Sequence, residues 1–223
     1  DLLATEYTIA TVAVDISAST TPFRKEMEEA LKETVKTLRL SPRADNLMLR
    51  VVLFGSQVEE LHGFKLLEHI NEDDYNNTVS DTHLGGMTAL YDATENSVGA
   101  ITKYAGDLRD ADFDANAIFI VITDGEENAS STTITKVKVA MQNAVTGEAL
   151  ESVVSILVGI NVQDGSVSRA LNSFNTDAGF SQYVEAKDAD RKTLAKLANF
   201  VSRSISSQSA SLGTGSASKS LVF

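Results

Sequence analysis

The feature that most constrains this fold is the alternation of apolar, β-branched runs with longer segments of helical period. The runs that predict strands lie at 7–14, 47–54, 117–123, 152–160 and 180–186, with a shorter run at 62–67. The helical patterns cover 22–40, 88–108, 132–145, 165–174 and 188–205. Strands that alternate with helices typically form a mostly parallel sheet with helices on both faces. The sequence therefore predicts an α/β fold with a doubly wound, mostly parallel six-stranded sheet and one short antiparallel edge strand.

The length of 223 residues fits one domain with a short tail, because single cores commonly stop growing at roughly 250–300 residues. Pro22 suits the first turn of the first helix, and Asp188 is expected to cap the last one. From Ser206 onward the chain is rich in serine and glycine without a helical or strand period, which predicts a flexible tail. We therefore expect a domain over residues 1–206 and a Ser/Gly-rich C-terminal tail over residues 207–223.

The formal net charge of −12 argues against a surface that binds nucleic acid or anionic membranes, and it favours cations or basic proteins as partners. The longest purely apolar run, 117–122, is far shorter than the roughly 20 residues of a membrane-spanning helix, so no membrane insertion is expected. The chain contains no cysteine, which excludes disulfides and thiolate metal sites and favours a cytoplasmic location. Because the chain does not begin with Met, a removed leader and secretion are the alternative.

Oxygen-bearing side chains gather where the predicted strands end. The first strand runs into a D-x-S-x-S sequence, and two further loops add a threonine and an aspartate, so the candidate ligands are Asp15, Ser17, Ser19, Thr88 and Asp124. In open α/β sheets, ligands bind outside the carboxyl ends of the strands. Two carboxylates and three hydroxyls suit Mg²⁺ or Mn²⁺, which keeps waters and accepts an outside carboxylate. Each loop alone fits a helix cap or an Asp-Gly turn, but the three together favour a metal site.

These motifs, in this order on alternating strands and helices, resemble the von Willebrand factor A (vWA) domain family over roughly residues 5–206. The resemblance implies a Rossmann-like fold with an intact metal-ion-dependent adhesion site. It implies that Ser17 and Ser19 bind the metal directly, that Thr88 does so in a high-affinity state, and that the two aspartates act directly or through water. The implied ion is Mg²⁺, with Mn²⁺ or Ca²⁺ as alternatives. Ala18 stands where many members carry glycine, which affects the loop and not the ligand atoms.

The resemblance implies a divalent-cation-dependent protein–protein interaction module and not an enzyme, with a Glu or Asp of the partner completing the metal's coordination. A second interpretation is a structural or assembly subunit of a multiprotein complex or particle, which would use metal-independent surfaces and the C-terminal tail. A third is a Mg²⁺-dependent hydrolase acting at Asp15, although such enzymes generally carry a second acid where Ser17 stands.

Further polar residues lie close in sequence to the predicted ligands. Glu126, Glu127 and Asp92 either tune metal affinity or form a solvated rim. Asn76 and Asn128 head N-x-S/T sequences, which matter only in a secreted protein. Most such sequences in intracellular chains are accidental.

Overall fold

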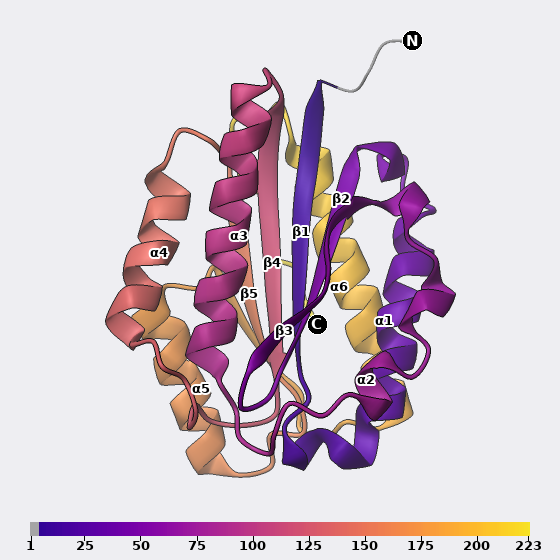
Figure 1. The fold of residues 1–223 in the computed structure, drawn as a ribbon, viewed down its shortest axis with the longest axis vertical. Helices are drawn as coiled ribbons and strands as arrows, with labels where there is room; N and C mark the ends of the chain where they lie inside the picture. Colours follow the sequence, from indigo (N-terminus) through magenta and orange to yellow (C-terminus); the bar gives the residue numbers. More distant parts are fainter. Residues whose placement is uncertain (1–4) are drawn as a thin grey trace.

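The computed structural model describes residues 5–223 and has three layers, with one sheet between two layers of helices (Figure 1). The strands are β1 (Glu6–Asp15), β2 (Leu47–Phe54), β3 (Val58–Leu66), β4 (Asp114–Thr123), β5 (Val153–Gly159) and β6 (Gln182–Glu185). Their order across the sheet is β3-β2-β1-β4-β5-β6. The pair β2 and β3 is antiparallel and every other pair of neighbours is parallel. The predicted fold class is therefore confirmed.

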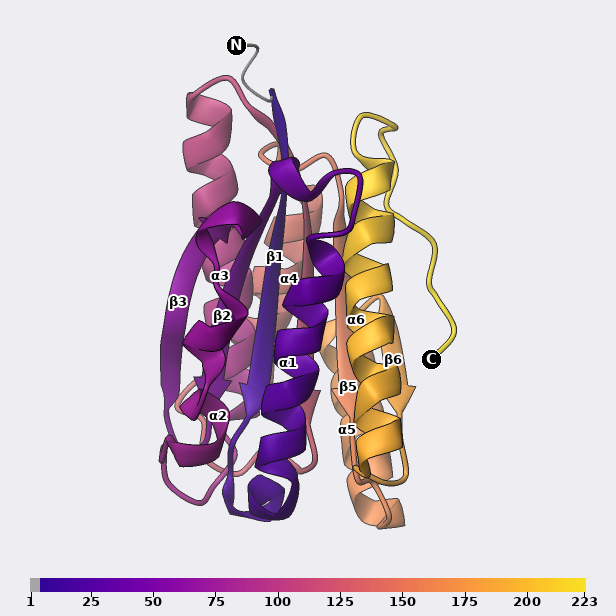
Figure 2. The ribbon, with the colours of Figure 1, turned by 90° about the vertical axis from the view of Figure 1, so that its right-hand side faces the viewer.

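The helices divide between the two faces of the sheet. One face carries α1 (Arg24–Leu38) and α6 (Arg191–Ser211), and the other carries α3 (Leu90–Asp110), α4 (Ile134–Thr146) and α5 (Gly165–Ala178) (Figure 2). Short helical turns fill the connections: η1 (Ala18–Phe23), η2 (Ala44–Asn46), η3 (Leu67–His69), η4 (Glu72–Tyr75) and α2 (Thr78–Asp81). Within residues 5–223 no helix combines the length and the apolar character that crossing a membrane requires.

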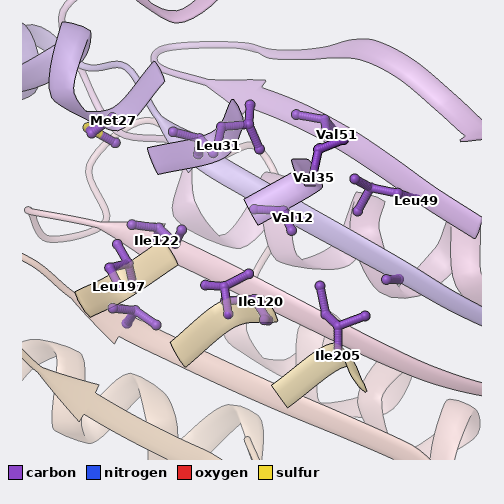
Figure 3. Close-up of a cluster of buried hydrophobic side chains, with 14 of the residues drawn as sticks. Val12, Met27, Leu31, Val35, Leu49, Val51, Ile120, Ile122, Leu197 and Ile205 are labelled. Carbon is purple, nitrogen blue, oxygen red and sulfur yellow. The ribbon is translucent and has the colours of Figure 1, made fainter. Parts of the chain in front are cut away.

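The sheet is buried on both faces, because successive side chains of a strand point to opposite layers of helices. In β4, Ile118 and Ile120 belong to the core under α1 and α6, whereas Phe119 and Val121 belong to the core under α3, α4 and α5. Figure 3 shows the first of these cores, in which side chains of α1 and α6 meet those of β1, β2 and β4. This two-sided burial explains the near-continuous apolar runs in the sequence.

Several predicted boundaries are wrong for identifiable reasons. Pro22 lies inside the short turn η1, two residues before α1 begins. Asp190, and not Asp188, caps α6, because the carboxylate of Asp190 accepts the N–H of Thr193 at 2.7 Å. The edge strand is nine residues long and starts at Val58, four residues before the predicted run at 62–67. The prediction misses its start because solvent-facing side chains hide the alternation that marks a strand.

The last helix runs six residues beyond the predicted end at residue 205. Gln208, on the inner face of that extension, is fully buried and donates hydrogen bonds to the carbonyl of Ala117 (3.2 Å) and to Ser152 Oγ (2.9 Å). A polar side chain therefore occupies a core position, which breaks the apolar period without ending the helix.

After α6 the chain folds back along its own domain (Figure 2). The ring of Phe223 packs edge-on against Phe200 of α6, with ring centroids 5.7 Å apart, and Leu221 also packs against the core. The carbonyl of Leu221 accepts a hydrogen bond of 2.7 Å from Gln182 of β6. The division into a domain over 1–206 and a tail over 207–223 remains a prediction, and residues 1–4 of that domain lie outside the described residues.

Candidate metal centre

Asp15 is the last residue of β1 and is fully buried. One carboxylate oxygen accepts the N–H of Ser17 at 2.8 Å, and the other accepts the hydroxyl of Thr123 at 2.6 Å. Thr123 ends β4, the strand beside β1, so the carboxylate joins the two strand ends. This edge is also where the crossovers turn to opposite sides of β1, which is the position in which open α/β sheets bind ligands.

The two serines connect the first loop to the loop after β4. The hydroxyls of Ser17 and Ser19 lie 3.1 Å apart, and the hydroxyl of Ser19 donates to the carboxylate of Asp124 at 2.7 Å. Ser17 is buried and Ser19 is exposed, so this row of oxygens leads from the interior to the surface. The structure therefore brings Asp15, Ser17, Ser19 and Asp124 together as one hydrogen-bonded group.

Thr88 completes the set from a third loop, just before α3 begins at Leu90. Its side chain is near Gly125, because a Cβ placed on that glycine would lie 3.7 Å from Thr88 Oγ1. Thr88 is 4% exposed and Asp124 is 8% exposed, so both residues lie just below the protein surface. All five predicted ligand residues are thus found at one edge of the sheet.

Burial sets the electrostatics of this group. Removal from water raises the pKa of Asp15 to about 6, against the opposing effect of its hydrogen bonds from Thr123 and Ser17, and the charge of Asp124 adds to the rise. Burial also raises the pKa of Asp124, and the hydrogen bond from Ser19 opposes this. Two neighbouring buried carboxylates are costly to ionise together, and a cation beside them would lower that cost.

The donor chemistry fits a hard divalent cation. The five residues supply two carboxylates and three hydroxyls, and oxygen ligands are those that Mg²⁺, Mn²⁺ and Ca²⁺ prefer. Among residues 5–223, no three His, Cys, Asp or Glu side chains are grouped so that they could hold a metal. Any metal at this edge therefore depends on the hydroxyl oxygens as much as on the carboxylates.

Arg24 holds the first loop in place, a role that the sequence analysis did not assign. Its buried guanidinium donates to the carbonyls of Ile16 and Ser17, the latter at 3.0 Å. Its Nε also donates to Thr20 Oγ1 at 3.2 Å, and that hydroxyl donates to the carbonyl of Ser17 at 2.8 Å. The only signal in the sequence is a basic residue shortly after the D-x-S-x-S motif, which does not distinguish it from a surface arginine.

Two of the three acidic residues expected beside the site have structural partners. The carboxylate of Glu127 accepts the N–H groups of Tyr91 (2.9 Å), Ala129 (2.8 Å) and Ser130 (2.6 Å). The carboxylate of Asp92 accepts the N–H groups of Ser131 (2.9 Å) and Thr132 (2.8 Å). Glu127 and Asp92 therefore fasten the start of α3 to the loop after β4, and Glu126 remains exposed.

Comparisons with solved structures identify the fold. The pilus adhesin SpaC from Lactobacillus rhamnosus GG, in its open conformation, is similar over 91% of this chain and 30% of its own, with a TM-score of 0.67 and 11% identity. The PilB minor pilin from Streptococcus sanguinis has a TM-score of 0.65 and 11% identity, over 92% of this chain and 63% of its own. Proximal thread matrix protein 1 from the mussel byssus, with a zinc-occupied MIDAS motif, has a TM-score of 0.58 and 18% identity, over 89% of this chain and 46% of its own. The chain thus spans less than two thirds of these proteins.

Comparisons at the level of sequence identify the family. A search among curated protein sequences finds no match. The family model of the von Willebrand factor type A domain matches residues 11–215, which is most of the chain and includes all five candidate ligands. With the sheet order and the structural neighbours in agreement, the chain belongs to the von Willebrand factor type A domain family.

Proposed function

We propose that this protein is a divalent-cation-dependent protein–protein interaction module. The observation that carries the proposal is the hydrogen-bonded group at the carboxyl edge of the sheet, in which Asp15 and Asp124 are linked through Ser17 and Ser19 and only Ser19 is exposed. Domains of this family typically serve protein–protein interaction or adhesion, and an adhesin is among the structural neighbours. The proposal therefore assigns the site to binding a partner.

In this proposal Ser17, Ser19 and Thr88 hold Mg²⁺ together with the two aspartates, and Mn²⁺ or Ca²⁺ are the alternatives. A bound ion supplies a positive charge to which the Glu or Asp of a protein partner binds. The exposed hydroxyl of Ser19 lies where the row of oxygens reaches the surface, so the partner approaches over this residue. The hydrogen bond from Ser19 orients the carboxylate of Asp124 toward the same row.

A binding role agrees with the environment of Asp15 better than a catalytic one. A nucleophilic carboxylate has to reach its substrate, whereas Asp15 is fully buried and both of its oxygens accept hydrogen bonds. The proposal therefore includes that the protein is not a hydrolase acting at Asp15. Absence of phosphate-ester turnover in excess Mg²⁺ is the expected result, and turnover that Asp15→Asn abolishes would contradict it.

The test is the thermal unfolding midpoint in chelator and in excess Mg²⁺ or Mn²⁺, for the wild type and for Asp124→Ala. At a free metal concentration about 100 times the dissociation constant, linkage adds about 2.7 kcal/mol, which raises the midpoint by roughly 5–10 °C for a domain of this size. The expected result is a rise in the wild type alone. No rise in the wild type, together with a silent direct titration, would refute the metal site.

Partner binding is tested with Ser17→Ala/Ser19→Ala, which removes two proposed ligands and leaves both carboxylates. The expected result is a folded variant that has lost metal-dependent binding to a partner protein. Binding by the wild type that persists in chelator would instead support the structural or assembly role, in which metal-independent surfaces and the C-terminal tail make the contacts.

A further inference from the structure

We propose that Asn128 is a positioning residue that holds Thr88 in place beside Asp124. The proposal rests on the metal-binding function proposed above, because it concerns how one of the ligands reaches its position. Asn128 lies four residues after Asp124, in the loop that leads from β4 to α4. Its relevance follows from its two contacts with the loop that carries Thr88.

Asn128 engages both main-chain polar atoms of Thr88. The N–H of Thr88 donates to Asn128 Oδ1 at 2.7 Å, and the N–H of Asn128 donates to the carbonyl of Thr88 at 3.0 Å. The two residues are forty positions apart in sequence. This reciprocal pair fixes the position and the orientation of the Thr88 backbone relative to the Asp124 loop.

The residues on either side of Thr88 are anchored to other parts of the molecule. Met87 donates its N–H to Ser56 Oγ at 3.1 Å, and Ala89 donates its N–H to the carbonyl of Gly55 at 2.7 Å. These bonds hold the loop to the end of β2 and not to the Asp124 loop. The side chain of Asn128 is therefore the partner through which the Thr88 N–H itself is fastened to the metal site.

The physical importance of this contact comes from the chemistry of Thr88. A hydroxyl ligand carries no net charge, so its contribution to metal binding depends on its placement more than a carboxylate's does. Thr88 is only 4% exposed whereas Asn128 is exposed, so in Asn128→Ala a water can bond to the freed N–H of Thr88 but does not tie the Thr88 loop to the Asp124 loop. The main chain of Thr88 then has more freedom to move relative to Asp124, and the hydroxyl is expected to be less well placed for the metal.

The experiment measures the dissociation constant for Mn²⁺, from the signal of the free ion in electron paramagnetic resonance, in the wild type and in Asn128→Ala. Loss of a residue that orients a metal ligand typically weakens binding by about tenfold or more. We expect about a tenfold weakening in Asn128→Ala. Asn71→Ala is the matched control, because Asn71 also accepts a main-chain N–H through its Oδ1, at 3.1 Å, but lies on the β3–α2 connection.

A double-mutant cycle separates positioning from a general loosening of the loop. If Asn128 acts through Thr88, Asn128→Ala has no further effect on the dissociation constant once Thr88→Ala has removed the hydroxyl. An equal loss in both backgrounds would overturn the proposal, and so would a change of less than twofold in the single variant. Failure of the wild type to bind Mn²⁺ would instead refute the proposed function.

A measurement on the unaltered protein covers the case in which Asn128→Ala does not fold. In chelator, the amide of Thr88 is expected to exchange with deuterium far more slowly than an unprotected amide, because its N–H is bonded and nearly buried. Exchange at the unprotected rate would contradict the proposed clamp.

Discussion

Replacement of Asp15 by asparagine is expected to stabilise the protein without metal and to destabilise it, relative to the wild type, when metal is bound. Burial raises the pKa of Asp15 from 3.8 to about 6, so at pH 7 its charged form destabilises the metal-free fold by about 3 kcal/mol, at 1.36 kcal/mol for each pKa unit. Asparagine has the same shape without the charge. Removal of the charge therefore stabilises the metal-free fold, but the new N–H groups of the amide offset about 1–2 kcal/mol of this stabilisation. They are buried beside the Ser17 N–H and the Thr123 hydroxyl, which are donors and cannot accept their hydrogen bonds as a carbonyl would.

In chelator at pH 7, Asp15→Asn is therefore expected to be more stable than the wild type by about 1–2 kcal/mol, which raises the unfolding midpoint by about 2–8 °C. In excess Mg²⁺ the order reverses, because only the wild type keeps the carboxylate that binds the ion. Calorimetry under both conditions measures the two differences. The exposed carboxylate of Asp107 provides the control, since Asp107→Asn is expected to change neither.

The pH dependence gives an independent check on the same reasoning. A group whose pKa is raised by folding adds stability below its unfolded value, and that stability is lost as the pH rises through the folded value. The advantage of Asp15→Asn in chelator should therefore shrink as the pH falls from 7 to 5. An Asn variant that is less stable than the wild type in chelator, with a gap independent of pH, would refute the electrostatic argument.

Three further predictions concern the loops and the tail. Gly85 has a φ of +82°, and a Cβ there would lie 2.3 Å from the hydroxyl oxygen of Ser56. Gly85→Ala should therefore lower the free energy of unfolding in chemical denaturation by about 1–3 kcal/mol and weaken Mn²⁺ binding. Gly86→Ala is the control and should do neither, because a Cβ at Gly86 has its nearest atom at 3.5 Å. Phe223→Ala should lower stability by about 1–2 kcal/mol through the lost ring contact, and Val222→Ala, at an 87% exposed position, by less than about 0.5 kcal/mol; equal losses would contradict the docked tail. Burial lowers the pKa of His62 below 6.5, so the neutral imidazole contributes its full stability above pH 6.5, and this stability is lost as the pH falls from 6.5 toward the lower pKa of the folded state. His62→Gln should remove this part of the acid sensitivity in urea denaturation.

The sequence predicts most of the sheet because two-sided burial leaves a strong apolar signal. In β4 and β5 the runs are nearly continuous, and both strands appear where expected. The edge strand β3 is different, because Glu59 and Glu60 face water and interrupt the pattern. The cap of α6 is ambiguous in the sequence because two aspartates, Asp188 and Asp190, come just before the helix starts at Arg191. In the structure the carbonyl of Asp188 accepts the N–H of Asn161, and this hydrogen bond holds Asp188 in the preceding loop.

For the site, the order of motifs predicts which strand ends supply oxygens, and the structure places those residues together. What the order does not contain is the contact between loops far apart in sequence. Asn128 and Thr88 are forty residues apart, and nothing in either segment indicates that they pair. Arg24 is a similar case, because its role depends on the direction in which the D-x-S-x-S loop presents its carbonyls.

The central position of β1 has a mechanical consequence. This strand is hydrogen-bonded to β2 from Thr8 to Asp15 and to β4 from Glu6 to Val14, and both neighbours run parallel to it. A force applied at Asp15 along the axis of the strand would load the bonds on both sides together in shear, and they would not break one after another. We therefore expect the resistance of the domain to pulling to be greatest along the axis of β1, which ends at the proposed metal site.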